Sequence, residues 1–263
     1  MDSVISLLGP FSFRGKARLL HSLSPKSGER TAEVFGYNIS VDLSDYIQRS
    51  IYLNAFEPRE SALVRDYLKP GMTFVDVGAN VGYFTLMAAS LVGVRGAVVA
   101  FEPSPYAFDR LARTIEGNQL PQVRAIQAAL SDTSGTLQIY VPKLPGNHTP
   151  TMVANDGGDP IDVATHRLDE CLVDLGIDRV DLMKIDVEGF EPNVLRGAKS
   201  YLEHGKINAI LCEFNRLWLE ANKSSPAQLY DDITSYGYEL ADGRPDFNAN
   251  LQTLLFTRTR MSG

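Results

Sequence analysis

The sequence contains little cysteine, no run of basic residues and no long apolar segment. Among its 263 residues only Cys171 and Cys212 are cysteines, and they lack metal-ligand spacing and are too few for a disulfide framework. We therefore expect buried thiols. No apolar run approaches the roughly 20 residues that span a bilayer, and the N-terminus lacks the basic-then-apolar order of a secretion signal. These absences predict a cytoplasmic protein without a membrane partner.

Basic residues are outnumbered by acidic ones. The chain has 25 Lys and Arg against 32 Asp and Glu, which gives a net charge of −7. Proteins that bind nucleic acid usually carry a basic face, because neutralising phosphates supplies most of their non-specific affinity. The scattered basic residues therefore predict no nucleic-acid partner and favour a neutral or cationic small molecule as the ligand.

Hydrophobic residues make up 44% of the chain, and their spacing predicts strands that alternate with helices. The predicted strands cover residues 73–77, 97–102, 123–130, 180–186 and 208–214, and the predicted helices cover residues 60–68, 82–92, 106–118, 191–204 and 227–236. The chain then ends in two strands with a turn-rich connection, so the last strand should run antiparallel to the others. This order predicts an α/β fold, with a doubly wound, mostly parallel sheet and a terminal antiparallel strand.

Two segments depart from this alternation. Residues 33–54 predict a strand pair, so residues 1–70 are interpreted as an N-terminal strand pair and helix that cap the substrate side of a domain over residues 71–263. Residues 135–142 predict an extra strand, and residues 143–160 predict a long loop rich in Gly, Pro, Asn and Asp. Long loops in compact domains are often lids, so we expect the strand pair and this loop to cover a ligand pocket.

A glycine-rich loop follows the first strand of the alternation, in the segment Phe74–Thr85 (FVDVGANVGYFT). Gly78 and Gly82 permit a tight turn, and the helix that follows offers unpaired N–H groups to a ligand. A plain strand-to-helix connection has the same appearance, so the neighbouring residues decide between the two interpretations. Asp76 would repel a pyrophosphate but suits the ammonium of a methionine moiety, and Asn80 replaces the middle glycine of the dinucleotide fingerprint. The loop therefore favours S-adenosylmethionine as the cofactor.

Polar residues after the next two strands extend the predicted cofactor site. Glu102 ends the strand that follows Gly78, where a carboxylate can accept both ribose hydroxyls. Leu130 is expected to pack on an adenine ring whose exocyclic amine Ser131 and Asp132 reach, although Asp132 equally suits the start of an Asp-Thr-Ser-Gly turn. The complete set of predicted cofactor contacts is Glu57, Asp76, Gly78, Ala79, Asn80, Tyr83, Phe84, Glu102, Pro103, Ser104, Ser131 and Asp132.

Several blocks of the sequence resemble the FkbM family of methyltransferases, over about residues 54–256. These blocks are DVGANVGYFT (76–85), FEP (101–103), ALSD (129–132), KIDVEGFE (184–191) and the pair Leu168-Asp169. The resemblance implies a Rossmann-like class I fold, S-adenosylmethionine as methyl donor, and O-methylation of a hydroxyl on a natural product such as a polyketide or on a sugar. It also supports Asp76, Gly78, Asn80 and Glu102 as cofactor contacts. Where the family commonly has Thr-Leu-Asp, this chain has His166-Arg167-Leu168-Asp169.

Three carboxylates are expected to converge where the transferred methyl group would lie: Asp186 and Glu188 after one predicted strand and Glu213 after the next. Methyl transfer is an in-line displacement in which the acceptor oxygen must also lose its proton. We predict Asp186 or Glu188 as the base and Glu213 as an orienting group, with a purely structural hydrogen-bonded network as the alternative. Lys184 lies on a strand that should be buried on both faces, so it requires an acidic partner.

Other residues are candidates for the same tasks. Histidine is the commoner general base, so His148 and His166 are alternatives to the carboxylates. Clustered carboxylates also suit Mg²⁺, although we expect no metal. Tyr46, Tyr52 and Phe56 are candidate apolar walls of the acceptor pocket.

Three other protein classes share parts of this pattern. Nucleic-acid methyltransferases that act on base amino groups typically carry an Asn/Asp-Pro-Pro-aromatic block after the fourth strand, where this chain has Asp186-Val-Glu-Gly. A nicotinamide-dependent oxidoreductase is disfavoured by Asn80 and by the terminal hairpin. A non-catalytic scaffold has no reason to retain both Asp76 and Glu102. The sequence therefore predicts an O-methyltransferase whose partner is a hydroxylated small molecule and whose product is S-adenosylhomocysteine.

Overall fold

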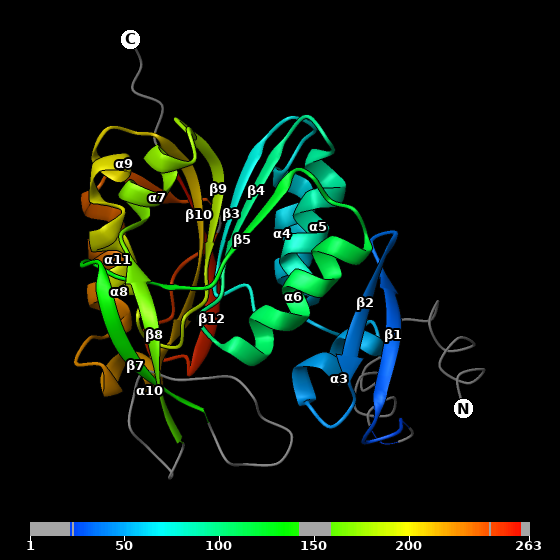
Figure 1. The fold of residues 1–263 in the computed structure, drawn as a ribbon. Coiled ribbons are helices and arrows are strands. Elements are labelled where there is room, and N and C mark those ends of the chain that lie inside the picture. The colour runs from blue at the N-terminus through cyan, green and yellow to red at the C-terminus, as the bar shows by residue number, and fades with distance from the viewer. Residues whose placement is uncertain (1–21, 23, 142–158, 242, 259–263) are drawn as a thin grey trace.

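A seven-stranded sheet forms the centre of the computed structural model, which describes residues 22, 24–141, 159–241 and 243–258 (Figure 1). The strands, in their order across the sheet, are β11 (Tyr238–Leu240), β12 (Leu251–Arg258), β10 (Ile207–Asn215), β9 (Val180–Ile185), β3 (Thr73–Val77), β4 (Ala97–Phe101) and β5 (Val123–Ile126). Neighbours from β10 to β5 pair in parallel, whereas β12 pairs antiparallel with both β10 and β11. The predicted α/β fold with a terminal antiparallel strand is confirmed.

Helices cover both faces of this sheet (Figure 1). One face carries α4 (Pro58–Tyr67), α5 (Tyr83–Val92) and α6 (Pro105–Gly117), and the other carries α7 (Leu168–Asp174), α8 (Glu191–Gly197), α9 (Lys199–Glu203) and α11 (Pro226–Ser235). Successive strand residues alternate between the faces. Phe74 and Leu182 belong to the hydrophobic cluster that includes residues of α4 and α5, and Val75 and Met183 belong to the cluster that includes residues of α7, α8, α9 and α11. This double burial explains the continuous apolar character of the strands. Within the described ranges, no helix is both long enough and apolar enough to cross a membrane.

The N-terminal strand pair is present, but it starts before residue 33 and ends well before residue 54, the limits of the predicted range. β1 (Glu29–Val34) and β2 (Tyr37–Asp42) pair antiparallel, and buried side chains of both join the hydrophobic cluster beneath α4 and α5. The second half of the predicted pair is instead helix α3 (Tyr46–Tyr52). Asp45 explains the difference, because its side chain accepts the backbone N–H of Gln48 at 2.9 Å and thereby caps the helix.

A second sheet has three strands, β6 (Ala129–Leu130), β8 (Asp159–His166) and β7 (Gly135–Val141), in that order. The prediction of one strand over 123–130 is therefore wrong. A tight turn, in which the N–H of Ala128 donates to the carbonyl of Ile126 at 3.0 Å, ends β5 and redirects the chain into β6. The extra strand predicted over 135–142 is β7. The end of the predicted loop belongs to β8, and residues 142–158 lie outside the described part of the chain.

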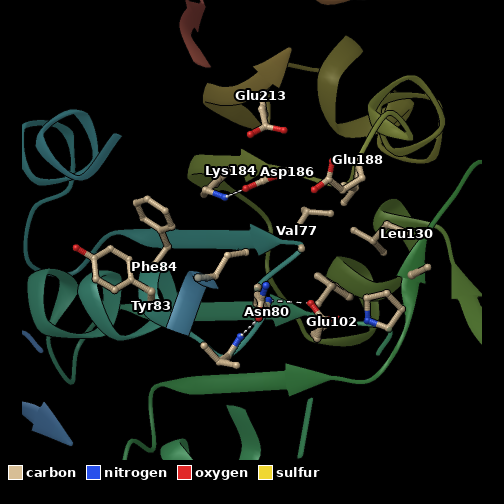
Figure 2. Close-up of a pocket in the computed structure, with 18 of the residues that line it drawn as sticks. Val77, Asn80, Tyr83, Phe84, Glu102, Leu130, Lys184, Asp186, Glu188 and Glu213 are labelled. Atoms are coloured by element: carbon tan, nitrogen blue, oxygen red, sulfur yellow. Dashed lines mark hydrogen bonds and ion pairs between the residues drawn. The ribbon is translucent and has the colours of Figure 1, made fainter. Parts of the chain in front are cut away.

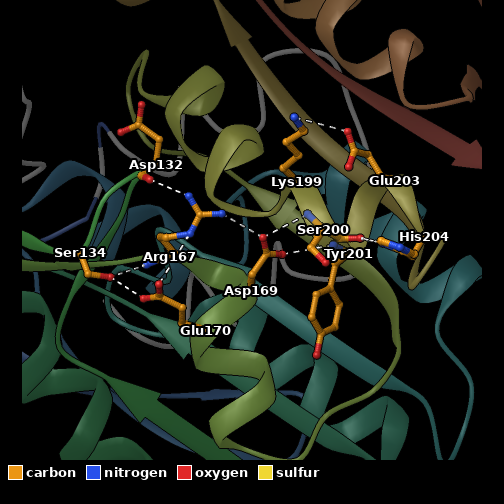
Figure 3. A network of polar contacts seen from close by, with 10 residues as sticks. All are labelled: Asp132, Ser134, Arg167, Asp169, Glu170, Lys199, Ser200, Tyr201, Glu203 and His204. Carbon is orange, nitrogen blue, oxygen red and sulfur yellow. Dashed lines mark hydrogen bonds and ion pairs between the residues drawn. The ribbon is translucent and has the colours of Figure 1, made fainter.

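The helix predicted over 191–204 is two helices, α8 and α9, because a second helix cap interrupts it. Asp169 supplies this cap: its carboxylate oxygens accept the backbone N–H groups of Ser200 at 3.1 Å and Tyr201 at 3.2 Å (Figure 3). Arg167 holds the same carboxylate through a 3.2 Å contact. The segment of residues 166–169, in which this chain departs from the family pattern, therefore joins the second sheet to α9.

Candidate active site

The main sheet gathers the predicted site residues at one edge. The winding of the sheet reverses between β3 and β9, and ligands of open α/β sheets bind beyond the carboxyl ends of the strands at such a point. A cavity of about 1020 Å³, its opening to solvent included, lies there (Figure 2). It brings together the predicted residues Gly78, Ala79, Asn80, Tyr83, Phe84, Glu102, Pro103, Asp186, Glu188 and Glu213.

The glycine-rich loop between β3 and α5 has a backbone that few residue types adopt. Gly78, Asn80 and Gly82 have φ angles of 84°, 50° and 98°, all in the left-handed region. The N–H of Gly78 donates to the carbonyl of Phe101 at 3.0 Å, which ties the loop to the end of β4. A Cβ at position 78 would lie 1.9 Å from the carbonyl oxygen of Asp186. Glycine is therefore required here by close packing against the chain that follows β9.

Gly78→Ala is expected to lower the free energy of unfolding by at least about 3 kcal/mol, because it adds overpacking to left-handed backbone strain. Gly71→Ala is the matched control, since Gly71 has a φ of 85° but no atom within 4 Å of the added Cβ. We expect a loss of about 1–2 kcal/mol for that control. Urea unfolding followed by circular dichroism measures both values, and equal losses would contradict the packing role of Gly78.

Glu102 directly follows β4, and its carboxylate is fixed at the cavity (Figure 2). Its Oε2 accepts the N–H of Asn80 at 2.8 Å, and its Oε1 accepts the N–H of Ser104 at 2.9 Å. Burial raises the pKa of Glu102 to about 7, and these two backbone N–H groups oppose the rise. Each carboxylate oxygen keeps further acceptor capacity, so the group can receive hydrogen bonds from two adjacent hydroxyls.

Asp76 lies on β3 and is buried, and it is not among the residues that line the cavity. Its Oδ2 accepts the hydroxyl of Thr85 at 2.7 Å, and its Oδ1 is buried without a partner. Burial raises the pKa of Asp76, and the ammonium of Lys184, its register partner on β9, opposes the rise. An unpartnered buried carboxylate oxygen favours a cationic group nearby.

Lys184 has the acidic partner that its buried position requires. Its Nζ lies 2.8 Å from Oδ2 of Asp186 and 4.7 Å from the centroid of the Phe84 ring (Figure 2). Burial alone would lower the pKa of Lys184, but the surrounding carboxylates, Asp186 foremost, raise it above its usual value. The lysine therefore keeps its charge and holds the Asp186 carboxylate in place.

The loop after β9 presents Glu188 to the cavity in a strained backbone conformation, with a φ of 51°. The next residue, Gly189, has a φ of 91°, and a Cβ there would lie 2.4 Å from the carbonyl oxygen of Trp218 on α10 (Arg216–Ala221). Glu191 fixes the loop from inside, because its Oε1 accepts two backbone N–H groups of the loop at 3.1 Å and 3.3 Å. Close packing and a buried carboxylate thus position Glu188.

Glu188 and Glu213 differ from Asp186 in having no ion-pair partner among the described residues. Oε2 of Glu188 is buried without a hydrogen bond. Burial, followed by the negative charges of Asp186 and Glu191, raises the pKa of Glu188 to about 8. Burial also raises the pKa of Glu213, at the end of β10, well above its usual value. The three carboxylates predicted to converge therefore share one cavity, and two of them favour the protonated form.

Glu57 lies beside this cluster, immediately before α4. It has a φ of 35°, and burial raises its pKa to about 7 while the ammonium of Lys184 opposes the rise. Asn80, Glu57 and Glu188 are all residues other than glycine in the left-handed region. Such backbone strain gathers at functional sites, where the surrounding structure maintains it.

The remaining predicted contacts lie outside the cavity lining. Ser104 is buried, and its N–H is bonded to Glu102. Ser131 donates to the carboxylate of Asp132, which forms a 3.2 Å ion pair with Arg196. Leu130, the predicted adenine contact, does line the cavity.

The predicted apolar walls are only partly placed at the cavity. Phe56 lines it, whereas Tyr46 is 60% exposed and Tyr52 packs in the hydrophobic cluster beneath α5. His166 is not part of the lining, and His148 lies outside the described residues.

Sequence reasoning did not identify Ile47, Ile51 and Ile139 as lining residues, or Glu191 as a support of the Glu188 loop. The signal for Glu191 was present in the block KIDVEGFE, as a second acid two residues after Gly189. Within the described residues, no three His, Cys, Asp or Glu side chains are arranged to hold a metal ion.

The fold and the site define a Rossmann-like class I methyltransferase domain. A family model described as the methyltransferase FkbM domain matches residues 76–240, and the chain belongs to this family. It is 35% identical over 153 residues to methyltransferase sdnD of Sordaria araneosa, a match that covers 47% of this chain and 59% of that protein. It is 31% identical over 161 residues to the 31-O-demethyl-FK506 methyltransferase FkbM of Streptomyces tacrolimicus, covering 50% of this chain and 61% of that protein.

Both matches span less than two thirds of the relative's own length. Among solved structures, the METTL16 methyltransferase domain superposes with a TM-score of 0.50 at 15% sequence identity, over 86% of this chain and 75% of that one. At this level of identity the likeness concerns the fold alone.

Proposed function

We propose that this protein transfers the methyl group of S-adenosylmethionine to a hydroxyl oxygen of a small molecule and leaves S-adenosylhomocysteine as product. The observation that carries the proposal is the arrangement of acids around the loop that follows β3. Glu102 lies on one side of that loop, and the cluster of Lys184 with Asp186, Glu188 and Glu213 lies on the other, within one cavity (Figure 2). In this arrangement, Glu102 can accept hydrogen bonds from the ribose hydroxyls, and the other carboxylates supply negative charge for a cationic sulfur.

The residues present fit this cofactor. Glu102 would hold the ribose through its two oxygens, and Leu130 would pack on the adenine. The unpartnered oxygen of Asp76 and the nearby carboxylate of Glu57 would favour the ammonium of the methionine moiety. A dinucleotide fits less well, because its pyrophosphate would meet several buried carboxylates and a single lysine that is already paired.

The chain's own residues then perform three tasks. When bound, S-adenosylmethionine supplies an electrophilic methyl group on a positively charged sulfur. Glu188 takes the proton of the acceptor hydroxyl, because it has an unpartnered oxygen and no cation bonded to it. Asp186, fixed by Lys184, and Glu213 orient the acceptor for in-line attack. Aromatic side chains such as Phe56 and Phe84 keep water from the reacting atoms.

The acceptor we propose is a neutral or cationic hydroxylated molecule with an apolar part. Ile47, Ile51 and Ile139 supply apolar surface to the cavity, and an anionic acceptor would face Glu188 and Glu213. Two of these isoleucines come from α3, which supports the interpretation that the described part of residues 1–70 caps the acceptor side. The relative from Streptomyces tacrolimicus is a 31-O-demethyl-FK506 methyltransferase, a name that places its own reaction on an oxygen, and we extend that reaction type to this chain.

Isothermal titration of the full chain tests the cofactor assignment. We expect S-adenosylhomocysteine to bind with a Kd in the micromolar range and NAD to give no heat of binding. A screen of hydroxylated metabolites and sugars with labelled S-adenosylmethionine then identifies the acceptor by transfer of label. Tight binding of NAD together with no response to S-adenosylhomocysteine would refute the proposal.

A further inference from the structure

The cavity region holds more negative than positive side chains in the part of the chain that the structure describes. Five carboxylates interact electrostatically with Lys184, so that one partner of each pair shifts the pKa of the other: Glu57, Asp76, Asp186, Glu188 and Glu213. The lysine can offset only one of these charges, and its Nζ is committed to Asp186 at 2.8 Å. A buried cluster of like charges cannot ionise fully without a further cation.

Glu188 is the member of this cluster that both lines the cavity and has a buried carboxylate oxygen without a hydrogen bond, among the residues that the structure describes. The groups that affect its pKa come from each neighbouring element: Lys184 from β9, Asp186 from the loop after β9, Glu191 from α8, Glu213 from β10 and the Trp218 indole from α10. Only the lysine and the indole favour the ionised form. Oε2 of Glu188 is buried without a hydrogen bond, so the Trp218 indole, which donates a hydrogen bond to this side chain, satisfies a negative charge on Glu188 only in part.

We propose that Glu188 changes its protonation state with the charge on the cofactor sulfur, being ionised beside the sulfonium of S-adenosylmethionine and protonated beside the thioether of S-adenosylhomocysteine. This inference rests on the proposed function. It adds that the cavity distinguishes substrate cofactor from product cofactor by charge, in addition to shape.

The atoms and charges of the transfer balance on this scheme. The acceptor oxygen forms a bond to the methyl carbon, and the electron pair of the broken S–CH₃ bond stays on sulfur. The O–H bond of the acceptor breaks, and its proton passes to the Glu188 carboxylate. The positive charge of sulfur and the negative charge of Glu188 disappear in the same step, so the net charge buried in the cavity is unchanged. Proton loss to solvent follows when the products leave and the next S-adenosylmethionine binds.

The direction of the pH dependence follows from Glu188 in the free protein. Burial raises its pKa to about 8, so near neutral pH the free protein holds the proton. Binding of the sulfonium favours the ionised form and releases the proton, whereas the neutral thioether leaves it in place. The affinity for S-adenosylmethionine relative to S-adenosylhomocysteine is therefore expected to rise with pH below pH 8, by at most about tenfold per pH unit for one linked proton.

Isothermal titration at pH 7 in phosphate and in Tris tests the inference, because the two buffers differ in ionisation enthalpy. For the full chain we expect the heat of S-adenosylmethionine binding to depend on the buffer, with up to one proton released, and the heat of S-adenosylhomocysteine binding to be independent of it. Glu188→Gln is expected to abolish the difference between the ligands. Glu116→Gln, on the exposed face of α6, is the control and should retain the difference. Protons released by the ligand's own ammonium contribute equally in the unmodified protein, in Glu188→Gln and in Glu116→Gln, so they cancel when the proton release of these proteins is compared.

Each outcome has one meaning. Binding of both ligands with the same proton release would overturn the inference and leave the proposed function intact. A buffer-dependent difference that survives in Glu188→Gln but disappears in Glu213→Gln would also overturn it, because the proton would then belong to Glu213. Failure of both ligands to bind would refute the proposed function itself.

Discussion

Glu188→Gln is expected to lower kcat by about 10²- to 10⁴-fold, the usual contribution of a general base, while the Kd for S-adenosylhomocysteine changes by less than about threefold. Glutamine keeps the size of the side chain and resembles the protonated carboxyl that we infer beside the thioether product. It cannot accept the hydroxyl proton of the acceptor. Transfer of labelled methyl to an acceptor from the screen measures kcat, and isothermal titration measures the Kd.

The two neighbouring carboxylates supply the comparison for this variant. Glu213→Gln is expected to change KM for the acceptor more than kcat, because Glu213 orients the acceptor in our scheme. Asp186→Asn frees the ammonium of Lys184 to approach Glu188, so we expect a lower kcat and a shift of its pH profile to lower pH. Full turnover in Glu188→Gln together with loss of turnover in Asp186→Asn would assign the base to Asp186.

The parts of the fold that follow from local chemistry were predicted from the sequence. β3 and β9 are covered by helices on both faces, so their apolar runs are continuous and their limits are visible in the sequence. The strand pair predicted over 33–54 fails in its second half, because a single side chain, that of Asp45, caps helix α3 there. Alternating apolar residues in so short a segment fit a helix face as well as a strand face.

The candidate site was predicted where its residues lie in motifs and missed where distant segments meet. Glu102 and Asp186 follow strand ends, and the spacing of a parallel sheet places such residues at one edge. The packing of Gly78 against the carbonyl oxygen of Asp186 joins residues far apart in the chain, and no local pattern encodes it. The pairing of Lys184 with Asp186, by contrast, follows from the period of two along β9, which puts both side chains on one face.

Glu102→Ala is expected to weaken binding of S-adenosylhomocysteine by at least about 100-fold, since it removes two hydrogen bonds to a charged acceptor that contribute about 1.5–3 kcal/mol each. It also leaves the backbone N–H groups of Asn80 and Ser104 without their present acceptor. A general loss of the loop structure would weaken binding as well, so affinity alone does not identify the ribose contact.

A 2′-deoxy analogue of S-adenosylhomocysteine separates the two explanations. If Glu102 holds the ribose, the analogue binds the unmodified protein about tenfold or more weakly than S-adenosylhomocysteine, because it lacks one hydrogen bond to the carboxylate. Glu102→Ala has already lost that bond, so it should bind both ligands equally weakly. An analogue penalty of the same size in both proteins would show that the ribose hydroxyl is held elsewhere. In that case the role of Glu102 is to fix the loop after β3 through Asn80 and Ser104, and the preference for a nucleoside cofactor depends on the apolar surface around Leu130.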